Sequence, residues 1–128
     1  VQSLTIMLKE LGEKAEIIND IKFISGIVEA ESPEVLKNLA YQIRTESENS
    51  VLVIGSENNG KANLLVMVSD KLVNEKNINA ISIIKEISLE INGGGGGQPF
   101  LATAGGKNPG GISNAIRKAE EYLKNVKF

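Results

Sequence analysis

The chain has 128 residues, which is enough for one domain with a single hydrophobic core. Its 14 basic and 16 acidic residues leave a net charge of −2, which argues against a domain that holds nucleic acid by bulk electrostatic attraction but leaves room for a local basic patch. The sequence contains no cysteine and no histidine, which excludes thiol catalysis, disulfides, histidine bases and the common zinc sites.

An apolar stripe with heptad spacing runs through the first segment. It comprises Val1, Leu4, Leu8, Leu11, Ala15 and Ile18, with Met7 and Ile17 beside it. This spacing predicts a helix over residues 1–19. The helix could pack on its own domain, or it could be a dimer helix or the end of a longer coiled coil; so short a stripe leaves these alternatives open. Because the chain begins at Val1 rather than at methionine, we expect it to be cut from a longer protein.

A strand and a helix are expected next. Residues 21–29 are mostly apolar and β-branched, which is typical of a strand. Ser32 can cap a helix that has Pro33 in its first turn, and the apolar residues that follow recur at helical spacing. The members of this second stripe are Val35, Leu36, Leu39, Ala40 and Ile43.

Two continuous apolar runs, residues 51–56 and 63–69, indicate strands that are buried on both faces. The dipeptide Asn59-Gly60 between them is a strong hairpin signal, so the two strands should be antiparallel neighbours. Residues 78–91 then show helical spacing again. We expect this helix to direct inward Ile81, Ile84, Ile87 and Ile91.

The stretch over residues 93–111 holds nine of the chain's 13 glycines. We expect it to be a loop, with one short strand at Phe100-Leu101-Ala102-Thr103. An amphipathic helix should follow, and its apolar residues are Ile112, Ala115, Ile116, Ala119, Tyr122, Leu123 and Val126. Strands that alternate with helices, together with one hairpin, predict an α/β domain: a small mixed β-sheet with flanking helices, preceded by the N-terminal helix.

The glycine-rich stretch has three interpretations. It could be a flexible linker, although Phe100 and Leu101 need burial. Its glycines could be structural, because they permit positive φ and close backbone approach. They could also bind an anion: successive N–H groups at Ala104-Gly105-Gly106-Lys107, just before the last helix, would form a nest for phosphate oxygens.

The same stretch resembles the signature of the DHHA1 domain, in the version that ends alanyl-tRNA synthetases. The matching positions are the glycine run Gly93–Gly97, Pro99, Ala102, Ala104, Gly105 and Gly106. The resemblance covers roughly residues 20–126. It implies two parts, an N-terminal helix over residues 1–19 that ends a coiled-coil or linker segment, and a DHHA1-like globular domain over residues 20–128.

The resemblance implies a non-catalytic C-terminal accessory domain. In that family the domain contacts the outer corner of tRNA(Ala), links aminoacylation with editing in other domains of the same chain, and in some members forms a homodimer. ATP, magnesium and any zinc would belong to those other domains, so we expect no cofactor, metal site or catalytic residue here. We also expect a cytoplasmic protein, because the absence of cysteine is typical of intracellular proteins. No apolar run approaches the roughly 20 residues that cross a bilayer.

A single RNA-contact and phosphate-contact surface is predicted along the glycine-rich stretch. Its residues are Gly93, Gly94, Gly95, Gly96, Gly97, Gln98, Gly105, Gly106, Lys107 and Asn108. Weaker candidates are Lys61, Arg117 and Lys118, and for each of them the sequence favours a solvated surface charge over an RNA contact.

Two other functions stay open from the sequence. The same domain type is the substrate-binding half of DHH-family phosphoesterases, but there the motif usually reads GGH, and this sequence has no histidine. The chain could also be a pure dimerisation module with no affinity for RNA.

Overall fold

The computed structural model describes residues 16–18, 21–27, 37, 40–41, 49–58, 60–76 and 78–125. The expected helix over residues 1–19 therefore lies outside the described residues except at its end. The helix that we expect after Ser32 is described only at Lys37, Ala40 and Tyr41, which are helical.

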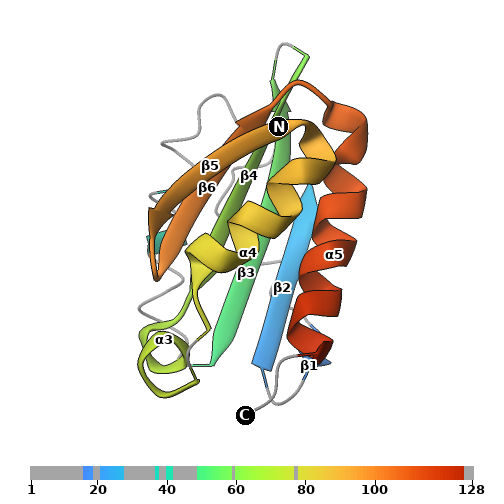
Figure 1. Ribbon diagram of the computed structural model, residues 1–128. Helices are drawn as coiled ribbons and strands as arrows, with labels where there is room; N and C mark the ends of the chain where they lie inside the picture. Colours follow the sequence, from blue (N-terminus) through green and yellow to red (C-terminus); the bar gives the residue numbers. More distant parts are fainter. Residues whose placement is uncertain are drawn as a thin grey trace.

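Six strands form one mixed sheet in the order β1-β2-β3-β4-β6-β5 (Figure 1). Of the five neighbouring pairs, β2–β3 is parallel and the other four are antiparallel. The strands are β1 (Glu16–Ile18), β2 (Ile21–Ile27), β3 (Ser50–Asn58), β4 (Lys61–Val68), β5 (Gly93–Gln98) and β6 (Leu101–Gly106). The predicted fold class, a small mixed sheet with flanking helices, is confirmed.

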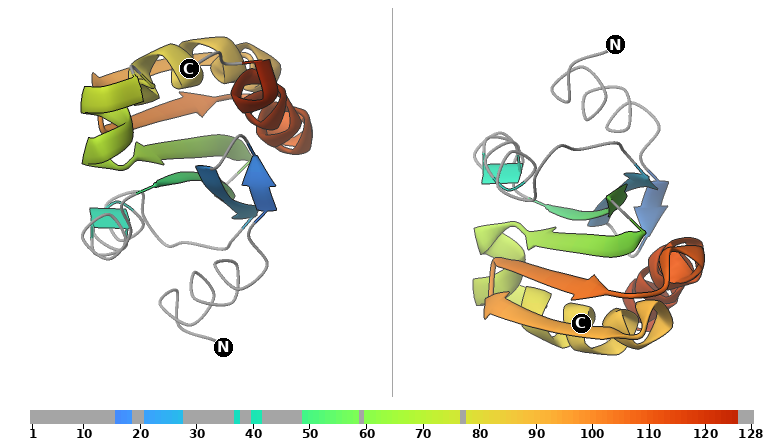
Figure 2. Two further views of the ribbon diagram at one scale, coloured as in Figure 1. Left: turned by 90° about the horizontal axis from the view of Figure 1, so that it is seen from below. Right: turned by 90° about the horizontal axis from the view of Figure 1, so that it is seen from above.

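Helices α4 and α5 cover one face of this sheet (Figures 1 and 2). The helical elements are α3 (Asp70–Lys76), α4 (Ala80–Ile87) and α5 (Ile112–Asn125), with the 3-10 helices η1 (Ser88–Ile91) and η2 (Pro109–Gly111). The sequence analysis assigned no element to the segment that forms α3. That helix is short and mostly polar, so it carries little hydrophobic periodicity.

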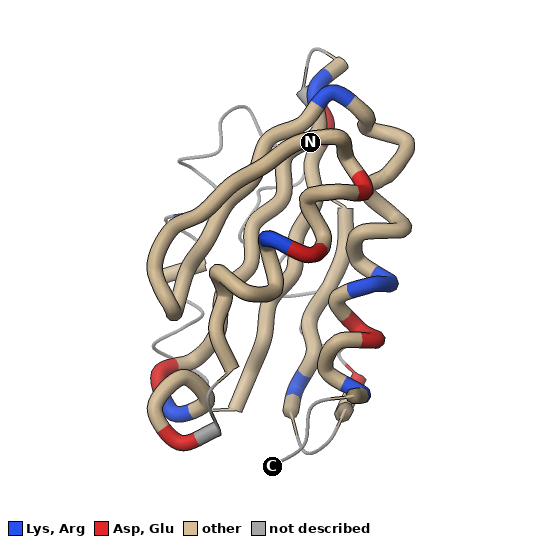
Figure 3. Tube along the Cα trace, in the orientation of Figure 1, with Lys and Arg blue, Asp and Glu red and all other residues tan. Residues whose placement is uncertain are grey.

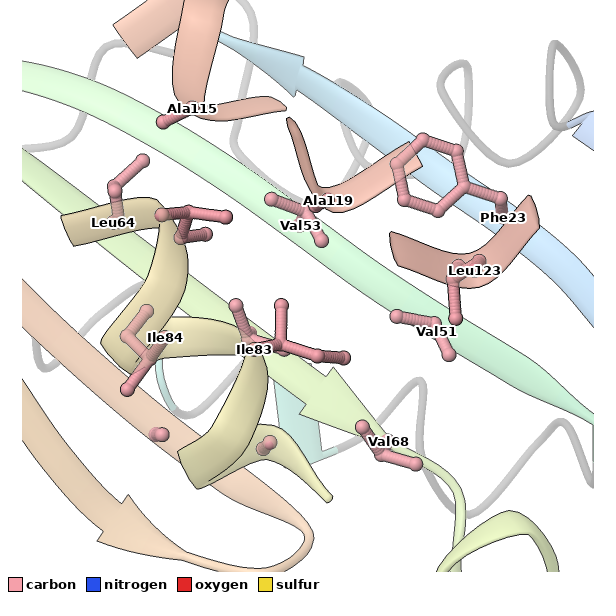
Figure 4. Close-up of a cluster of buried hydrophobic side chains, with 14 of the residues drawn as sticks. Phe23, Val51, Val53, Leu64, Val68, Ile83, Ile84, Ala115, Ala119 and Leu123 are labelled. Carbon is pink, nitrogen blue, oxygen red and sulfur yellow. The ribbon is translucent and has the colours of Figure 1, made fainter. Parts of the chain in front are cut away.

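Two apolar clusters lie on the two faces of the sheet. On the helix side, alternate residues such as Val51 and Val53 pack against α4 and α5 (Figure 4). On the other side, Leu52 and Ile54 pack with Ala40 and Tyr41. Residues 51–54 of β3 and 64–68 of β4 are buried on both faces of the sheet, and these two stretches are apolar throughout, as the two continuous runs predicted.

The hairpin β3–β4 is confirmed, with its turn at the predicted place. Gly60 has a φ of 77°, a left-handed value that favours glycine. Helix α4 is also confirmed; Asn79 caps it by accepting a hydrogen bond from the N–H of Ile81, at 2.7 Å. Ile83 and Ile84 are fully buried, whereas Ile81 is only partly buried, so the inward face is turned slightly from the predicted one.

Residues Glu16–Ile18 form strand β1 and not the end of a helix, which corrects the prediction for residues 1–19 at this point. The register pairs Ile18 with Ile21 across a two-residue connection, as in a tight hairpin. Ile18 is buried whereas Ile17 is 69% exposed, the alternation of a strand. Two adjacent β-branched residues favour this pairing over helix.

The glycine run forms a strand. The prediction that this part of residues 93–111 is a loop is therefore wrong. Gly93–Gln98 forms β5, and it pairs along its whole length with β6. The turn between the strands is held from outside: Pro99 C=O accepts from the N–H of Ala80 at 2.7 Å, and Phe100 C=O accepts from the N–H of Val68 at 2.8 Å. This segment is therefore not a flexible linker.

Candidate nucleic-acid interface

The two faces of strand β5 differ in the room that they leave for a side chain. Gly93 and Gly95 lie on the helix side, and a Cβ added to either would run into the backbone of β6, at Gly105 or Thr103. A Cβ added to Gly94 or Gly96 would meet no atom within 4 Å. Glycine is therefore required on the helix side by close backbone approach, and on the other side it leaves the backbone uncovered.

On the face of β5 that carries Gly94 and Gly96 lies a concave surface, which encloses a volume of about 400 Å³. Strands β4, β6 and β5 form its floor, and its lining includes Asn63, Gly94, Gly96, Thr103 and Gly105. The two polar side chains, Asn63 and Thr103, were missed by the sequence analysis. Asn63 is the first residue of the otherwise apolar run 63–68. A polar residue at that position indicates that one face of the strand is exposed there.

Two lysines lie at one end of this concave surface. The β4–β6 register pairs Ala62 with Gly106, so the next residues outward, Lys61 and Lys107, lie at the same end of the sheet, and both are exposed. Figure 3 shows basic positions at this end. By strand alternation Lys61 shares the face of Asn63. The structure thus places the weaker candidate Lys61 at the same end of the sheet as the predicted contact Lys107.

The expected phosphate nest does not form at residues 104–107. Ala104, Gly105 and Gly106 are strand residues of β6, which pairs with β4 on one side and with β5 on the other. Successive N–H groups in a strand point in opposite directions toward the neighbouring strands, so they do not converge on one anion. An anion at this end would depend on side chains, chiefly the two lysines.

The predicted contact residues are spread over the length of the hairpin. Gln98 is exposed at one end of β5, and Gly93, Gly106 and Lys107 are at the other. A six-residue strand separates these ends by roughly 17 Å. Asn108 is partly buried, and its side-chain amide donates to the C=O of Glu90 at 3.1 Å. The set therefore describes an extended surface rather than one small-molecule site.

Arg117 and Lys118 lie away from this surface. Both belong to α5, which packs on the opposite face of the sheet (Figure 1). Lys118 forms an ion pair with Glu90, with 3.6 Å between Nζ and Oε1. These two weaker candidates do not join Lys61 and Lys107.

A second, open groove of about 350 Å³ lies on the helix side, and it is lined by Glu86, Lys118, Glu121, Tyr122 and Asn125. Burial, and to a lesser extent the charge of Glu86, raises the pKa of Tyr122 above its ordinary value of 10.0. The phenol is therefore neutral near pH 7. Within the described ranges, no cluster of three or more acidic, histidine or cysteine side chains is placed to hold a metal ion.

A comparison of the sequence with protein families matches residues 20–125 to the DHHA1 domain. The chain belongs to the DHHA1 domain family. The predicted resemblance, over roughly residues 20–126, is thereby confirmed. In the part of this DHHA1 chain that the structure describes, no helix is long and apolar enough to cross a membrane.

Curated relatives and solved structures agree with this membership. The alanine–tRNA ligase of Christiangramia forsetii is 42% identical to this DHHA1 chain over 115 residues, which are 90% of the chain and 13% of that relative. The chain thus spans about one eighth of the length of the curated relatives that it matches.

Two solved structures have the same fold. The C-Ala domain from Aquifex aeolicus alanyl-tRNA synthetase is 32% identical, with a TM-score of 0.80 over 87% of this chain and 98% of that chain. A DHH domain described as a member of the s1p family of ribosomal proteins gives a TM-score of 0.64 over 98% of this chain and 31% of that one. Its identity of 15% shows the fold alone.

Proposed function

We propose that this chain is the C-terminal accessory domain of an alanine–tRNA ligase, that it binds tRNA(Ala), and that it catalyses no reaction itself. The observation that carries the proposal is the match to nearly the whole C-Ala domain, at 32% identity and a TM-score of 0.80. The 42% identity to a curated alanine–tRNA ligase supports it. The parent chain would then be the ligase, acting in the cytoplasm with its ATP and metal ions in other domains.

The surface chemistry suits contact with a folded RNA rather than reading of its sequence. The concave face exposes backbone, two small polar side chains and a pair of lysines at its rim. A-form RNA presents phosphates and 2′-hydroxyl groups, which such a surface can meet by shape and by charge. We assign the contact to the open face of β5 and β6 with Lys61 and Lys107, and the RNA region contacted to the outer corner of tRNA(Ala). By holding that corner, the domain would link aminoacylation with editing.

A titration of tRNA(Ala) into this chain tests the proposal. Because the net charge is −2 and few cations lie at the surface in question, we expect a dissociation constant on the order of micromolar or weaker. Lys107→Ala and Lys61→Ala should each weaken binding and reduce the salt dependence by about one phosphate contact. Lys71→Ala is the matched control, since Lys71 is exposed on α3, at the other end of the sheet.

The outcomes separate the alternatives. Saturable binding of a mononucleotide or dinucleotide, without affinity for tRNA, would indicate the substrate-binding half of a phosphoesterase. A tight dimer in analytical ultracentrifugation without RNA affinity would indicate a dimerisation module. If tRNA binds but Lys107→Ala and Lys61→Ala leave its affinity unchanged at low salt, the contact surface lies elsewhere on the domain.

A further inference from the structure

Asn108 joins two parts of the chain at the end of the glycine hairpin. Its side-chain amide donates to the C=O of Glu90 at 3.1 Å, and its main-chain N–H donates to the C=O of Ile91 at 3.0 Å. Its own C=O accepts from the N–H of Gly111 at 3.1 Å. Glu90 and Ile91 belong to η1, whereas Asn108 and Gly111 lie in the connection from β6 to α5.

The hydrogen bonds of Asn108 lie at the same end of the sheet as Lys61 and Lys107. Helix η1 ends at Ile91, just before β5 begins, and the first residue of β5, Gly93, pairs with the last residue of β6, Gly106. Lys107 stands between that pair and Asn108. The chain that enters β5 and the chain that leaves β6 are therefore tied together immediately beside Lys107.

The side-chain bond of Asn108 requires a hydrogen-bond donor. An amide nitrogen can donate to a carbonyl oxygen, whereas an alanine in its place would donate nothing. The residue is partly buried, and its amide nitrogen already donates to protein. Asn108 is thus poorly placed to be the direct RNA contact that the sequence suggested.

We propose that Asn108 is a positioning residue for RNA binding, one that acts by holding Lys107 at the rim of the concave surface. The inference rests on the proposed function, because it takes Lys107 as an RNA contact. A lysine on a fixed backbone loses less conformational entropy on binding than one on a loose backbone. Asn108 then contributes to affinity through Lys107 and not through a contact of its own.

A double-mutant cycle tests this inference. We expect Asn108→Ala alone to raise the dissociation constant for a tRNA(Ala) transcript roughly three- to tenfold at low salt. In the background of Lys107→Ala, the same substitution should change the constant by less than about twofold, since the group that it positions is gone. Asn114→Ala, at an exposed position of α5, is the control and should bind like the parent.

Each outcome decides the matter. Equal effects of Asn108→Ala in both backgrounds would show a direct contact or a general structural effect, and would overturn the positioning role. An Asn108→Ala variant that binds like the parent while Lys107→Ala weakens binding would overturn this inference alone. A parent chain without tRNA affinity would overturn the proposed function and this inference together.

Circular dichroism and thermal unfolding must show that the variants are folded at the temperature of the titration. If Asn108→Ala does not fold, Asn108→Leu takes its place in the same cycle, because leucine is close to asparagine in size and its side chain donates no hydrogen bond. If neither variant folds, Asn108 is a folding residue, and the proposal is wrong.

Discussion

Gly94 and Gly95 are adjacent in β5, yet substitutions at the two positions should have opposite effects. Gly94→Val places its side chain where no atom lies within 4 Å of the new Cβ, so the free energy of unfolding should stay unchanged or rise slightly. Gly95→Ala drives its Cβ into the backbone of β6 and should destabilise the domain by roughly 1–3 kcal/mol. Urea unfolding of both variants measures this difference.

The same pair of variants tests the contact surface. Gly94→Val covers part of the open face, so it should weaken tRNA binding while the domain stays folded. If that variant binds as tightly as the parent, the open face of β5 is not in contact with RNA. If Gly95→Ala is as stable as the parent, β5 and β6 do not pair in the register described above.

At the scale of elements, substitutions in β1 can distinguish the strand from the helix that the heptad stripe predicts. Ile18 is 7% exposed and Ile17 is 69% exposed, although the stripe counts both as inward-facing. Ile18→Ala should therefore destabilise the domain by roughly 2 kcal/mol or more, and Ile17→Ala by less than about 0.5 kcal/mol. Thermal unfolding checks both values. Similar losses at the two positions would support the helix.

The elements that the sequence predicted are those with a side-chain pattern. Strands β3 and β4 have continuous apolar runs because both faces are buried, and Gly60 marks their turn. Strand β5 has no pattern, since glycines carry no side chain; its position depends on pairing with β6 and on the two hydrogen bonds that hold its turn. Strand β1 is three residues long, and it lies within a spacing that also suits a helix.

At the scale of the whole molecule, the candidate site depends on strand order, which local patterns do not encode. Lys61 and Lys107 are far apart in the sequence, and they lie at the same end of the sheet because β6 pairs with β4 as well as with its neighbour in the chain, β5. The sequence identified Lys107 from the glycines beside it. It gave no reason to prefer Lys61 over Arg117 or Lys118, which α5 carries on the opposite face.

The last prediction concerns the surface through which two copies of this chain would form a homodimer. Over the described residues, the large apolar side chains that are exposed are Ile17, Ile27 and Leu89, which lie on different elements. Single exposed apolar residues are normal on a soluble surface and do not make an interface. We therefore expect any homodimer of this chain to use the apolar stripe of the first segment, most of which lies outside the described residues, with Leu8 near its centre.

Leu8→Glu should convert such a dimer to a monomer, because a carboxylate at an apolar contact must be desolvated. The DHHA1 part should stay folded, with the same thermal transition as the parent chain. Leu89→Glu is the matched control, since Leu89 is 67% exposed on η1, and it should leave association unchanged. Sedimentation equilibrium measures both. A parent chain that is monomeric at millimolar concentration would exclude the stripe as a contact between chains, and a dimer lost in Leu89→Glu would place the interface on the helix side of the sheet.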